Sequence, residues 1–336
     1  MRELLKTMRD TLALDRDVLL VSILAESGSA PRGAGACMLV SALGRLAGSI
    51  GGGAMEHQAA QLAGQLLRER RSLLKEYHLS RDLGMICGGE ATVFYQFIPA
   101  DNAYMSELCA AALRLMELDR DIWLITGLAK GGEWQMGLYS REEGPLFIEG
   151  DTKALLPLFK SIPASLTAGG ITWYAEQIHR AGRALIFGCG HVAQALTPLL
   201  CGLGFACWLM DDRPEFATAK LFPNATRVIC GSYEDIGRYI EIRPADFVVV
   251  MTHGHLCDYT VQKQAMRAFP AYIGVIGSKN KVRTINERLV AEGFCAEDIA
   301  RVKAPIGLPV GAETPAEIAV SIAAQLIQVR AEKSGK

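Results

Sequence analysis

The sequence lacks the motifs that mark the common hydrolases. It contains no G-x-S-x-G nucleophile elbow, no Walker A loop and no H-E-x-x-H zinc motif. No general acid–base pair stands out either. These absences argue against a hydrolase of the common kinds and direct attention to motifs that bind a ligand.

The chain also lacks an excess of charge of either sign. It has 35 basic and 36 acidic residues, so nothing suggests a surface for nucleic acid or for a membrane. No uninterrupted apolar run approaches the roughly 18 residues of a membrane span. The opening segment Met1–Lys6 has no apolar signal-peptide core. We therefore expect a cytoplasmic protein that binds neither nucleic acid nor a membrane.

Paired cysteines are missing as well. The nine cysteines are an odd number, and no two of them have C-x-x-C spacing. This pattern argues against a disulfide framework and a zinc ribbon, and for reduced thiols in the cytoplasm. Most of them should be small core residues.

What is present is enough apolar sequence for two domains of α/β class. The chain has 336 residues, half of them hydrophobic, and that length exceeds what one core usually organises. We expect a mixed α/β domain over residues 1–175 and a Rossmann-type parallel-sheet domain over 180–330, with the linker near 179–182. Segment 145–168 is ambiguous.

The sequence pattern predicts several elements in each half. In the first half, helices are expected at 1–16, 54–70 and 103–118, and strands at 18–25, 37–40, 76–79, 91–98, 121–128, 135–139 and 171–178. In the second half, helices are expected at 259–268, 281–292 and 315–330, and strands at 228–230, 247–252 and 272–276. Thr314-Pro-Ala-Glu317 predicts the start of the last helix, with Thr as N-cap and Glu three positions later.

The segment from Arg183 to Leu196 carries the clearest motif. An apolar run enters Gly188-Cys-Gly190-His-Val-Ala193, and a helical pattern follows. Asp211 and Asp212 close the next apolar run about 20 residues on, as in a dinucleotide-binding βαβ unit. In such a unit Gly188 would allow the tight turn, Gly190 the approach of a phosphate, and Ala193 close packing of helix on strand. An acid at the end of the second strand would hydrogen-bond a ribose hydroxyl.

Two further strand ends in this half carry polar residues. Met251-Thr-His253-Gly-His255-Leu-Cys257-Asp258 follows a buried strand, at the sheet edge where ligands of open α/β folds bind. Its donors suit a transition metal, and hydrogen bonding to a ligand or to loop backbone is the alternative. Gly277-Ser278-Lys279 is a small-residue turn with cations, suited to phosphate. The alternative is an ordinary helix start.

The first half has three glycine-rich candidates. Gly28 to Gly35 is a loop that contains Arg32, and Gly51-Gly52-Gly53 opens a helix, where backbone N–H groups can bind an anion. Tight connections between packed elements are the alternative. Cys87-Gly88-Gly89 lies in a loop with room for a ligand, where a thiolate can bind a soft metal or accept sulfur. The alternative for Cys87 is a buried small residue.

Taken together, these blocks resemble the XdhC/CoxI family, the xanthine dehydrogenase accessory factors of molybdenum cofactor maturation. The similar segments span almost the whole chain in family order. They are 27–38, 48–56, 83–89, 187–193, 211–216, 251–255, 272–279 and 305–315.

The resemblance implies a chaperone that binds molybdenum cofactor, protects it and helps deliver its sulfurated form to a xanthine dehydrogenase-like hydroxylase. It implies a cysteine desulfurase as the sulfur source, no independent turnover chemistry, and Cys87 as a contact to molybdenum or its sulfur. A homodimer is the default expectation. The residues expected to bind the cofactor are Arg32, Gly51, Gly52, Gly53, Cys87, Gly88, Gly89, Gly188, Gly190, His191, Ala193, Asp211, Asp212, His253, His255, Gly277, Ser278 and Lys279.

Two alternatives stay open at this point. Gly188, Gly190, Ala193 and Asp211 support an NAD(P)-dependent oxidoreductase equally well, with the acidic pair favouring NAD. A nucleotide-sensing regulatory module is the third hypothesis. Hydride exchange with a carbonyl substrate would single out the oxidoreductase, and nucleotide binding without molybdopterin binding would single out the sensor.

Overall fold

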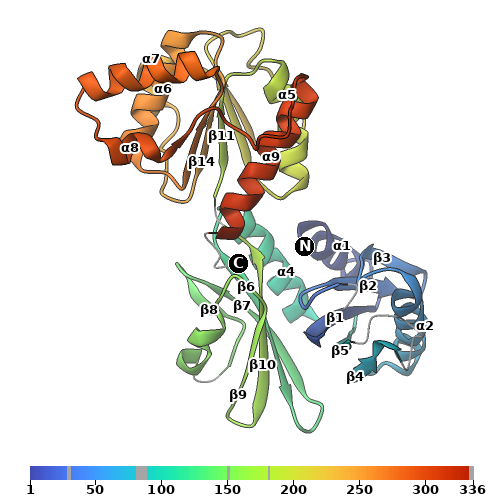
Figure 1. Ribbon diagram of the computed structural model, residues 1–336. Coiled ribbons are helices and arrows are strands. Elements are labelled where there is room, and N and C mark those ends of the chain that lie inside the picture. The colour runs from blue at the N-terminus through green and yellow to red at the C-terminus, as the bar shows by residue number, and fades with distance from the viewer. Residues whose placement is uncertain (29–31, 81–88, 150–151, 181, 333–336) are drawn as a thin grey trace. The chain divides into compact units, whose positions relative to one another are not determined.

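A computed structural model gives the structure of the chain. It describes residues 1–336 apart from 29–31, 81–88, 150–151, 181 and 333–336. The chain divides into two compact units, Met1–Arg180 and Ala181–Lys336, which are described separately (Figure 1). In the described part of the chain, no helix combines the length and the apolar character needed to cross a membrane.

The first sheet of the N-terminal unit is antiparallel, with strand order β3-β2-β1-β5-β4. Its strands are β1 (Val18–Ser27), β2 (Cys37–Ser41), β3 (Gly44–Gly48), β4 (Leu73–His78) and β5 (Glu90–Ile98). Alternate residues of β1 face opposite sides, as the period of a strand requires. Leu19 and Val21 pack beneath α2 (Gly53–Glu69). Val18 and Leu20 pack against α1 (Arg2–Leu12) and α4 (Ala103–Glu117).

The second sheet of this unit is also antiparallel, with strand order β8-β7-β6-β10-β9. Its strands are β6 (Ile122–Ala129), β7 (Trp134–Ser140), β8 (Gly144–Leu146), β9 (Ala164–Ala168) and β10 (Ile171–His179). Ile122 and Leu124 share the core of α1 and α4 with the first sheet. Ile125 and Trp173 pack on the other side with a short 3-10 helix, Thr152–Leu158. The ambiguous segment 145–168 therefore contains two short strands and this helix.

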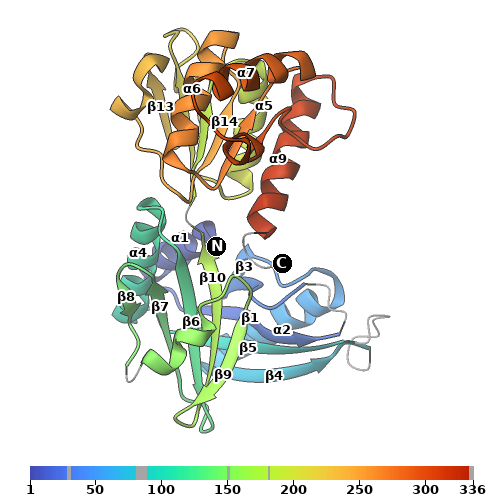
Figure 2. The ribbon, with the colours of Figure 1, turned by 60° about the vertical axis from the view of Figure 1, so that its left-hand side comes forward.

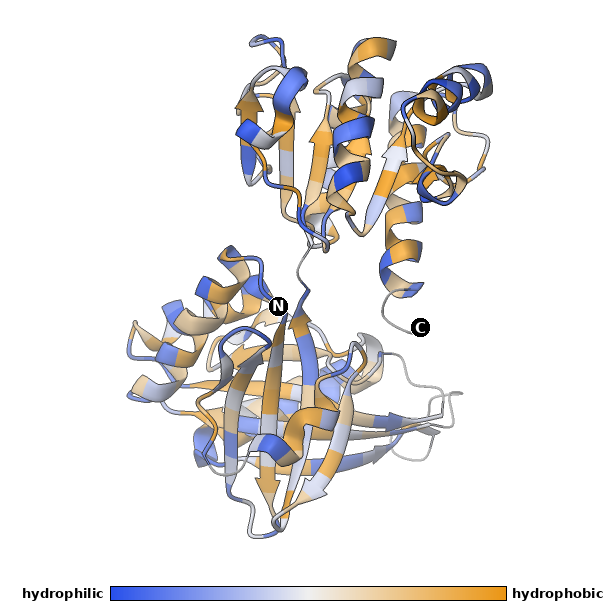
Figure 3. Cartoon of the chain, turned by 90° about the vertical axis from the view of Figure 1, so that its left-hand side faces the viewer, coloured by the Kyte–Doolittle hydropathy of each residue, from blue (hydrophilic) through white to orange (hydrophobic). Residues whose placement is uncertain are grey.

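The C-terminal unit is built on a parallel sheet of strand order β13-β12-β11-β14-β15-β16. Its strands are β11 (Ala184–Phe187), β12 (Cys207–Asp211), β13 (Arg227–Cys230), β14 (Phe247–Val250), β15 (Tyr272–Val275) and β16 (Val302–Lys303). The strands β11 and β14 are buried along their whole length, and the strands of this unit are mostly coloured as hydrophobic in Figure 3. Burial on both faces explains these continuous apolar runs.

Helices cover both faces of the parallel sheet (Figures 1 and 2). One face packs under α5 (His191–Gly202) and α9 (Pro315–Glu332), and the other under α6 (His255–Ala268) and α7 (Lys279–Ala291). The short helix α8 (Ala296–Ala300) precedes β16. The predicted fold class, a mixed α/β first half and a Rossmann-type second half, is confirmed.

Some predicted helix boundaries are wrong at the positions that matter most for function. The helices α6 and α7 begin at His255 and Lys279, earlier than the predicted starts at 259 and 281. Gly254 is the extended N-cap of α6, and Ser278 caps α7 by accepting from the backbone N–H of Lys281 (3.4 Å). His255 and Cys257 therefore lie in the first turn of a helix and not in the preceding loop.

The predicted start of the last helix is confirmed. The hydroxyl of Thr314 accepts from the backbone N–H of Glu317 (3.3 Å), and the Glu317 carboxylate accepts in return from the N–H of Thr314 (2.9 Å). This reciprocal pair is a capping box.

Candidate functional site at the carboxyl edge of the parallel sheet

The strand order of the C-terminal unit creates a crevice at one position. After β11 the chain continues to β12 on one side, whereas β14 lies on the other side of β11. Loops on either side of such a switch point diverge, and ligands of open α/β sheets bind between them at the carboxyl ends of the strands. The predicted glycine turn follows β11, the acidic pair ends β12, and the predicted histidine motif follows β14.

The two glycines of the turn differ in backbone conformation and in the space around them. Gly188 has φ +107°, and a Cβ there would lie 2.2 Å from the carbonyl oxygen of Met251. Because Gly188 has no side chain, the loop after β14 can lie in direct contact with the turn after β11. Gly190 has φ −72°, and a Cβ there would meet open space. Gly190 is the N-cap of α5, and no side chain described in the structure caps this helix.

His191 and Ala193 open α5 behind the turn. His191 is exposed in its first turn. Ala193 is fully buried and packs with Ile186 and Leu209 of the sheet. A small residue at this position brings the helix close to the strands, as the motif predicts.

Asp211 faces inward. Its side chain is 0% exposed, and one oxygen accepts from the backbone N–H of Cys189 at 2.7 Å. Its other oxygen accepts from the backbone N–H (3.0 Å) and from Nε (2.9 Å) of Arg213. Burial alone would raise the pKa of Asp211, but the hydrogen bonds from Arg213 and Cys189 outweigh it and hold the pKa below its usual value. A ribose contact from Asp211 would require breaking these bonds, so Asp212 is the acid of this pair that faces solvent.

Asp212 meets the histidine motif across the end of β11. The Nε2 atom of His253 lies 3.0 Å from Oδ1 of Asp212. The thiol of Cys257 completes a group whose three ligand atoms all lie within 4.8 Å of one another. Burial raises the pKa of Cys257, and the negative charge of Asp212 raises it further. His255 begins α6, and its side chain is outside the described part of the structure.

The turn after β15, which the sequence predicts to bind phosphate, has one of its cations engaged within the protein. The ammonium of Lys281 pairs with the fully buried carboxylate of Asp258 and donates to the carbonyl of Ile276 (3.0 Å). A Cβ on Gly277 would approach the Lys281 side chain at 2.7 Å. Lys281 therefore ties α7 to α6. Lys279 is the first residue of α7, and its side chain is outside the described part.

The Gly51–Gly53 loop in the N-terminal unit already holds an anion, the side chain of Glu56. One Glu56 oxygen accepts from the hydroxyl of Ser49 (2.5 Å) and from the backbone N–H groups of Ile50 (3.2 Å) and Gly52 (3.1 Å). The other pairs with Arg45 at 2.9 Å. The hydrogen bond from Ser49, followed by that from Gly52, lowers the pKa of Glu56. The three glycines have positive φ, so this backbone shape itself requires glycine.

The other candidates of this unit are only partly described. Arg32 is exposed, and Ser29 to Pro31 before it are outside the described residues. Cys87 and Gly88 are outside them as well, whereas Gly89 precedes β5 and accepts from the backbone N–H of Leu79 (3.0 Å). Whether Cys87 contacts a ligand therefore stays a prediction.

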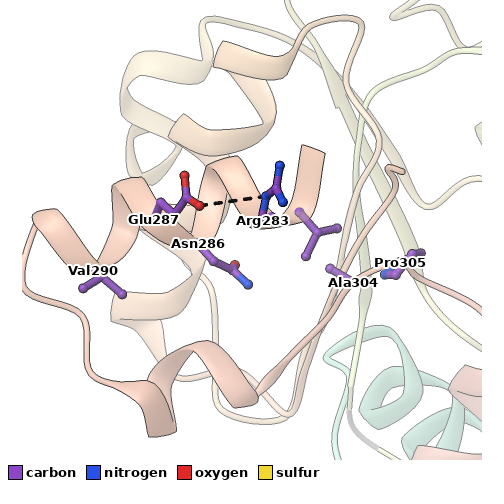
Figure 4. A pocket seen from close by; sticks show the side chains of 7 residues that line it. Arg283, Asn286, Glu287, Val290, Ala304 and Pro305 are labelled. Atoms are coloured by element: carbon purple, nitrogen blue, oxygen red, sulfur yellow. Dashed lines mark ion pairs between the residues drawn. The ribbon is translucent and has the colours of Figure 1, made fainter. Parts of the chain in front are cut away.

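A hollow of about 640 Å³ lies elsewhere on the C-terminal unit, along α7 and the segment after β16. Figure 4 shows its lining, with the exposed pair Arg283–Glu287 (3.9 Å) on the α7 side. The residues that line it are Val282, Arg283, Asn286, Glu287, Val290, Ala304 and Pro305. None of the predicted site residues with a described side chain is among them.

Sequence reasoning missed two residues of these loops. Glu56 follows the glycine loop by one helical turn, and an acid in the first turn of a helix that opens on glycines is the signal that marks it. Cys257 belongs to the histidine motif but was absent from the expected cofactor contacts. Because α6 begins at His255, Cys257 lies in its first turn, with its thiol within 4.8 Å of a ring nitrogen of His253.

Comparisons with known proteins agree with the two-unit description. Residues 12–78 match the XdhC and CoxI family model, and residues 184–326 match the model of the XdhC Rossmann domain. A Bacillus subtilis protein described as a probable xanthine dehydrogenase subunit is 29% identical, over 96% of this chain and 97% of that protein. The molybdenum cofactor insertion chaperone PaoD of Escherichia coli is 22% identical, over 98% of this chain and 88% of that protein.

A solved structure is similar along nearly the whole chain. The crystal structure of a protein described as a xanthine dehydrogenase from Bacillus halodurans has a TM-score of 0.80 and 25% identity, and covers 97% of this chain and 95% of its own. The resemblance predicted from the sequence blocks is thus confirmed in both halves. The chain belongs to the XdhC/CoxI family, and its second half is the XdhC Rossmann domain.

Proposed function

We propose that the protein is a chaperone that binds molybdenum cofactor and aids its sulfuration and its insertion into a xanthine dehydrogenase-like hydroxylase. The observation that carries the proposal is the relationship to PaoD, which extends over 98% of this chain and 88% of that chaperone. A relationship of this extent includes both units, so it supports a shared role and not only a shared nucleotide-binding fold.

The geometry of the sheet edge supports binding of the phosphorylated part of the cofactor. Molybdopterin carries a phosphate, and its dinucleotide form carries a pyrophosphate and a ribose. The N-terminus of α5 offers backbone N–H groups and a positive dipole end to such an anion, and Gly190 leaves the approach open. Asp212 is the acid placed for a ribose hydroxyl. We assign the phosphate to Gly190 and His191, because Glu56 fills the Gly51–Gly53 loop.

The sulfur chemistry is assigned to Cys87 by sequence alone. A loop thiol between Ile86 and two glycines is suited to contact molybdenum or its sulfur ligand. Arg32, exposed in the family block 27–38, supplies a cation for an anionic cofactor. The partners in this proposal are the recipient hydroxylase and a cysteine desulfurase, and the protein acts as a homodimer without turnover of its own.

An NAD(P)-dependent oxidoreductase is the second candidate, favoured by the turn Gly188-Cys-Gly190-His-Val-Ala193 on a parallel sheet. The inward position of Asp211 weakens it, because the acid that would bind the ribose is engaged with Cys189 and Arg213.

The test is a titration of the purified, cofactor-free protein with molybdenum cofactor and, separately, with NAD. Wild type, Cys87→Ala and the control Cys295→Ser are compared, since Cys295 is an exposed thiol on the second unit. The proposal expects micromolar or tighter binding of molybdenum cofactor, weaker in Cys87→Ala and unchanged in Cys295→Ser.

Other results have separate meanings. Binding of NAD alone would overturn the chaperone and favour the oxidoreductase or the nucleotide sensor. Equal binding of molybdenum cofactor by wild type and Cys87→Ala would keep the chaperone and remove Cys87 from its binding site.

A further inference from the structure

We propose that Asp212, His253 and Cys257 form a binding site for a divalent transition-metal ion of the zinc class, with one coordination position left for a ligand. The three residues come from separate parts of the C-terminal unit. Asp212 follows β12, His253 follows β14, and Cys257 lies in the first turn of α6. The site shares Asp212 with the proposed ribose contact, but its test does not depend on binding of molybdenum cofactor.

The distances between the three ligand atoms would suit a bound metal ion after small movements of the side chains. Nε2 of His253 and Oδ1 of Asp212 are 3.0 Å apart, and all three ligand atoms lie within 4.8 Å of one another. In a tetrahedral zinc site with bonds of about 2.0 to 2.3 Å, ligand atoms are roughly 3.3 to 3.6 Å apart. A rotation of the half-buried Cys257 side chain supplies the remaining ångström or so, and the metal replaces the proton between His253 and Asp212.

The backbone holds these residues in place. Gly188 of the intervening strand end has no side chain, which lets the loop after β14 lie directly against the turn after β11. The carboxylate of Asp258 accepts from the backbone N–H of Thr252 (2.8 Å) and from its hydroxyl (2.7 Å). Its second oxygen pairs with Lys281. This buried network fixes the turn that carries His253 and Cys257, as the outer shell of a metal site must do.

The charges match a divalent cation. An ionised Asp212 and a Cys257 thiolate supply two negative charges, and His253 is neutral as a ligand. Three further carboxylates act on the Cys257 thiol, from Asp211, Glu234 and Asp258. Arg213 and Lys281 pair with Asp211 and Asp258, so Asp212 and Glu234 leave the local potential negative. A bound cation would reverse this potential.

The donor set selects the kind of metal. A thiolate with an imidazole suits zinc, cobalt or copper, whereas magnesium and calcium prefer oxygen donors alone. Three protein ligands are also the number found in zinc sites that keep a position for water or a substrate. We therefore expect the fourth position to take water or an oxygen atom of an anionic ligand.

The experiment is a titration of the full-length, chelator-treated protein with Zn²⁺ by calorimetry and with Co²⁺ by absorption. Wild type should bind one equivalent with micromolar or tighter affinity, and the cobalt form should show thiolate-to-metal charge transfer. Cys257→Ala should abolish the charge-transfer band and weaken zinc binding at least about tenfold. His253→Gln should weaken it similarly.

Two further variants make the result specific. Cys295→Ser removes an exposed thiol outside the cluster and should leave both titrations unchanged. Cys257→His should restore much of the zinc affinity without the charge-transfer band, which a merely structural role for Cys257 would not produce. Circular dichroism checks that each variant is folded.

The proposal is overturned if wild type binds no stoichiometric zinc, or if Cys257→Ala keeps the charge-transfer band. Because these titrations contain the metal ion alone, their failure leaves the cofactor-binding proposal untouched.

Discussion

Two glycine-rich loops of this protein precede helices, α2 and α5, and they differ in how they interact with carboxylates of the chain. In the N-terminal unit, the loop before α2 binds the carboxylate of its own Glu56 through Ser49, Ile50 and Gly52. In the C-terminal unit, Asp211 takes only the N–H of Cys189 from the turn before α5, and Gly190 leaves space in front of the helix. The two loops look alike in sequence, but only the second is open to an external anion.

The comparison shows that glycines before a helix are necessary for an anion site but do not define one. Backbone N–H groups at a helix N-terminus bind the nearest anion of suitable geometry. Where the chain supplies that anion itself, the glycines support the fold. Where it does not, they are available to a ligand.

The largest effect on stability is expected at Gly188. Gly188→Ala would force φ +107° on a residue with a side chain and place its Cβ against the Met251 carbonyl. We expect a loss of about 3 kcal/mol or more in the free energy of unfolding, measured by urea denaturation. Gly44→Ala is the matched control, because its φ of +105° is close to that of Gly188 but its Cβ would meet open space. That variant should lose only about 1 to 2 kcal/mol, the cost of the strained φ alone. Equal losses would contradict the assigned contact between the loops after β11 and β14.

A second contrast concerns two carboxylates, one that accepts a hydrogen bond from a thiol and one that is paired with a guanidinium. Glu176 of β10 lies 3.6 Å from the Cys37 thiol, and burial raises its pKa from 4.5 to about 7. A group whose pKa is raised in the folded state favours folding in its protonated form. Stability of the N-terminal unit should therefore fall as the pH rises from about 4.5 to about 7.

The variant Glu176→Gln tests this pH dependence. It should remove the dependence and raise stability at pH 8 by about 1 to 3 kcal/mol. Hydrogen exchange of the β6 and β10 amides at both pH values measures it within the N-terminal unit. Asp211, whose pKa is lowered next to Arg213, should give no such fall in the C-terminal unit. A flat profile for β6 and β10 in the wild type would refute the raised pKa.

A substitution at Glu56 tests the difference between the two loops directly. Glu56→Ala removes the internal anion, and we expect a loss of about 1 to 2 kcal/mol as two backbone N–H groups lose their acceptor. Since its pKa is lowered, its contribution is present above the ordinary value of 4.5 and is lost as the pH falls below it.

The emptied loop of Glu56→Ala should gain binding of inorganic phosphate, detected by calorimetry. Glu69→Ala at the other end of α2 should gain none, and phosphate binding by both variants would refute the role of Glu56.

The sequence was sufficient for features that depend on neighbours in the chain. The strand–turn–helix around Gly188 and the capping box of Thr314 and Glu317 were predictable because their contacts span a few residues. The carboxyl edge as a meeting place of loops was predictable from parallel strands. The contact between His253 and Asp212 was not, because it depends on the order of strands β12, β11 and β14.

Side-chain direction is the other part that sequence could not supply. Asp211 and Asp212 are adjacent and identical, yet the first is buried and the second faces solvent. The direction of β12 turns Asp211 inward, where the N–H of Cys189 and the side chain of Arg213 bind its carboxylate. Glu56 was similarly hidden, since only the fold of β3 brings Arg45 to its carboxylate.

The smallest effect on stability is expected at Gly190, where the difference between the two loops is most specific. Gly190 has an ordinary φ of −72°, and a Cβ would meet no neighbour. Gly190→Ala should therefore change the free energy of unfolding by no more than about 1 kcal/mol, the usual cost of alanine at an N-cap. The same methyl group would stand in front of α5, where we place the cofactor phosphate, and should weaken binding of molybdenum cofactor at least about tenfold. Unchanged binding by a fully stable Gly190→Ala would move the phosphate away from α5, and the second loop would then be structural like the first.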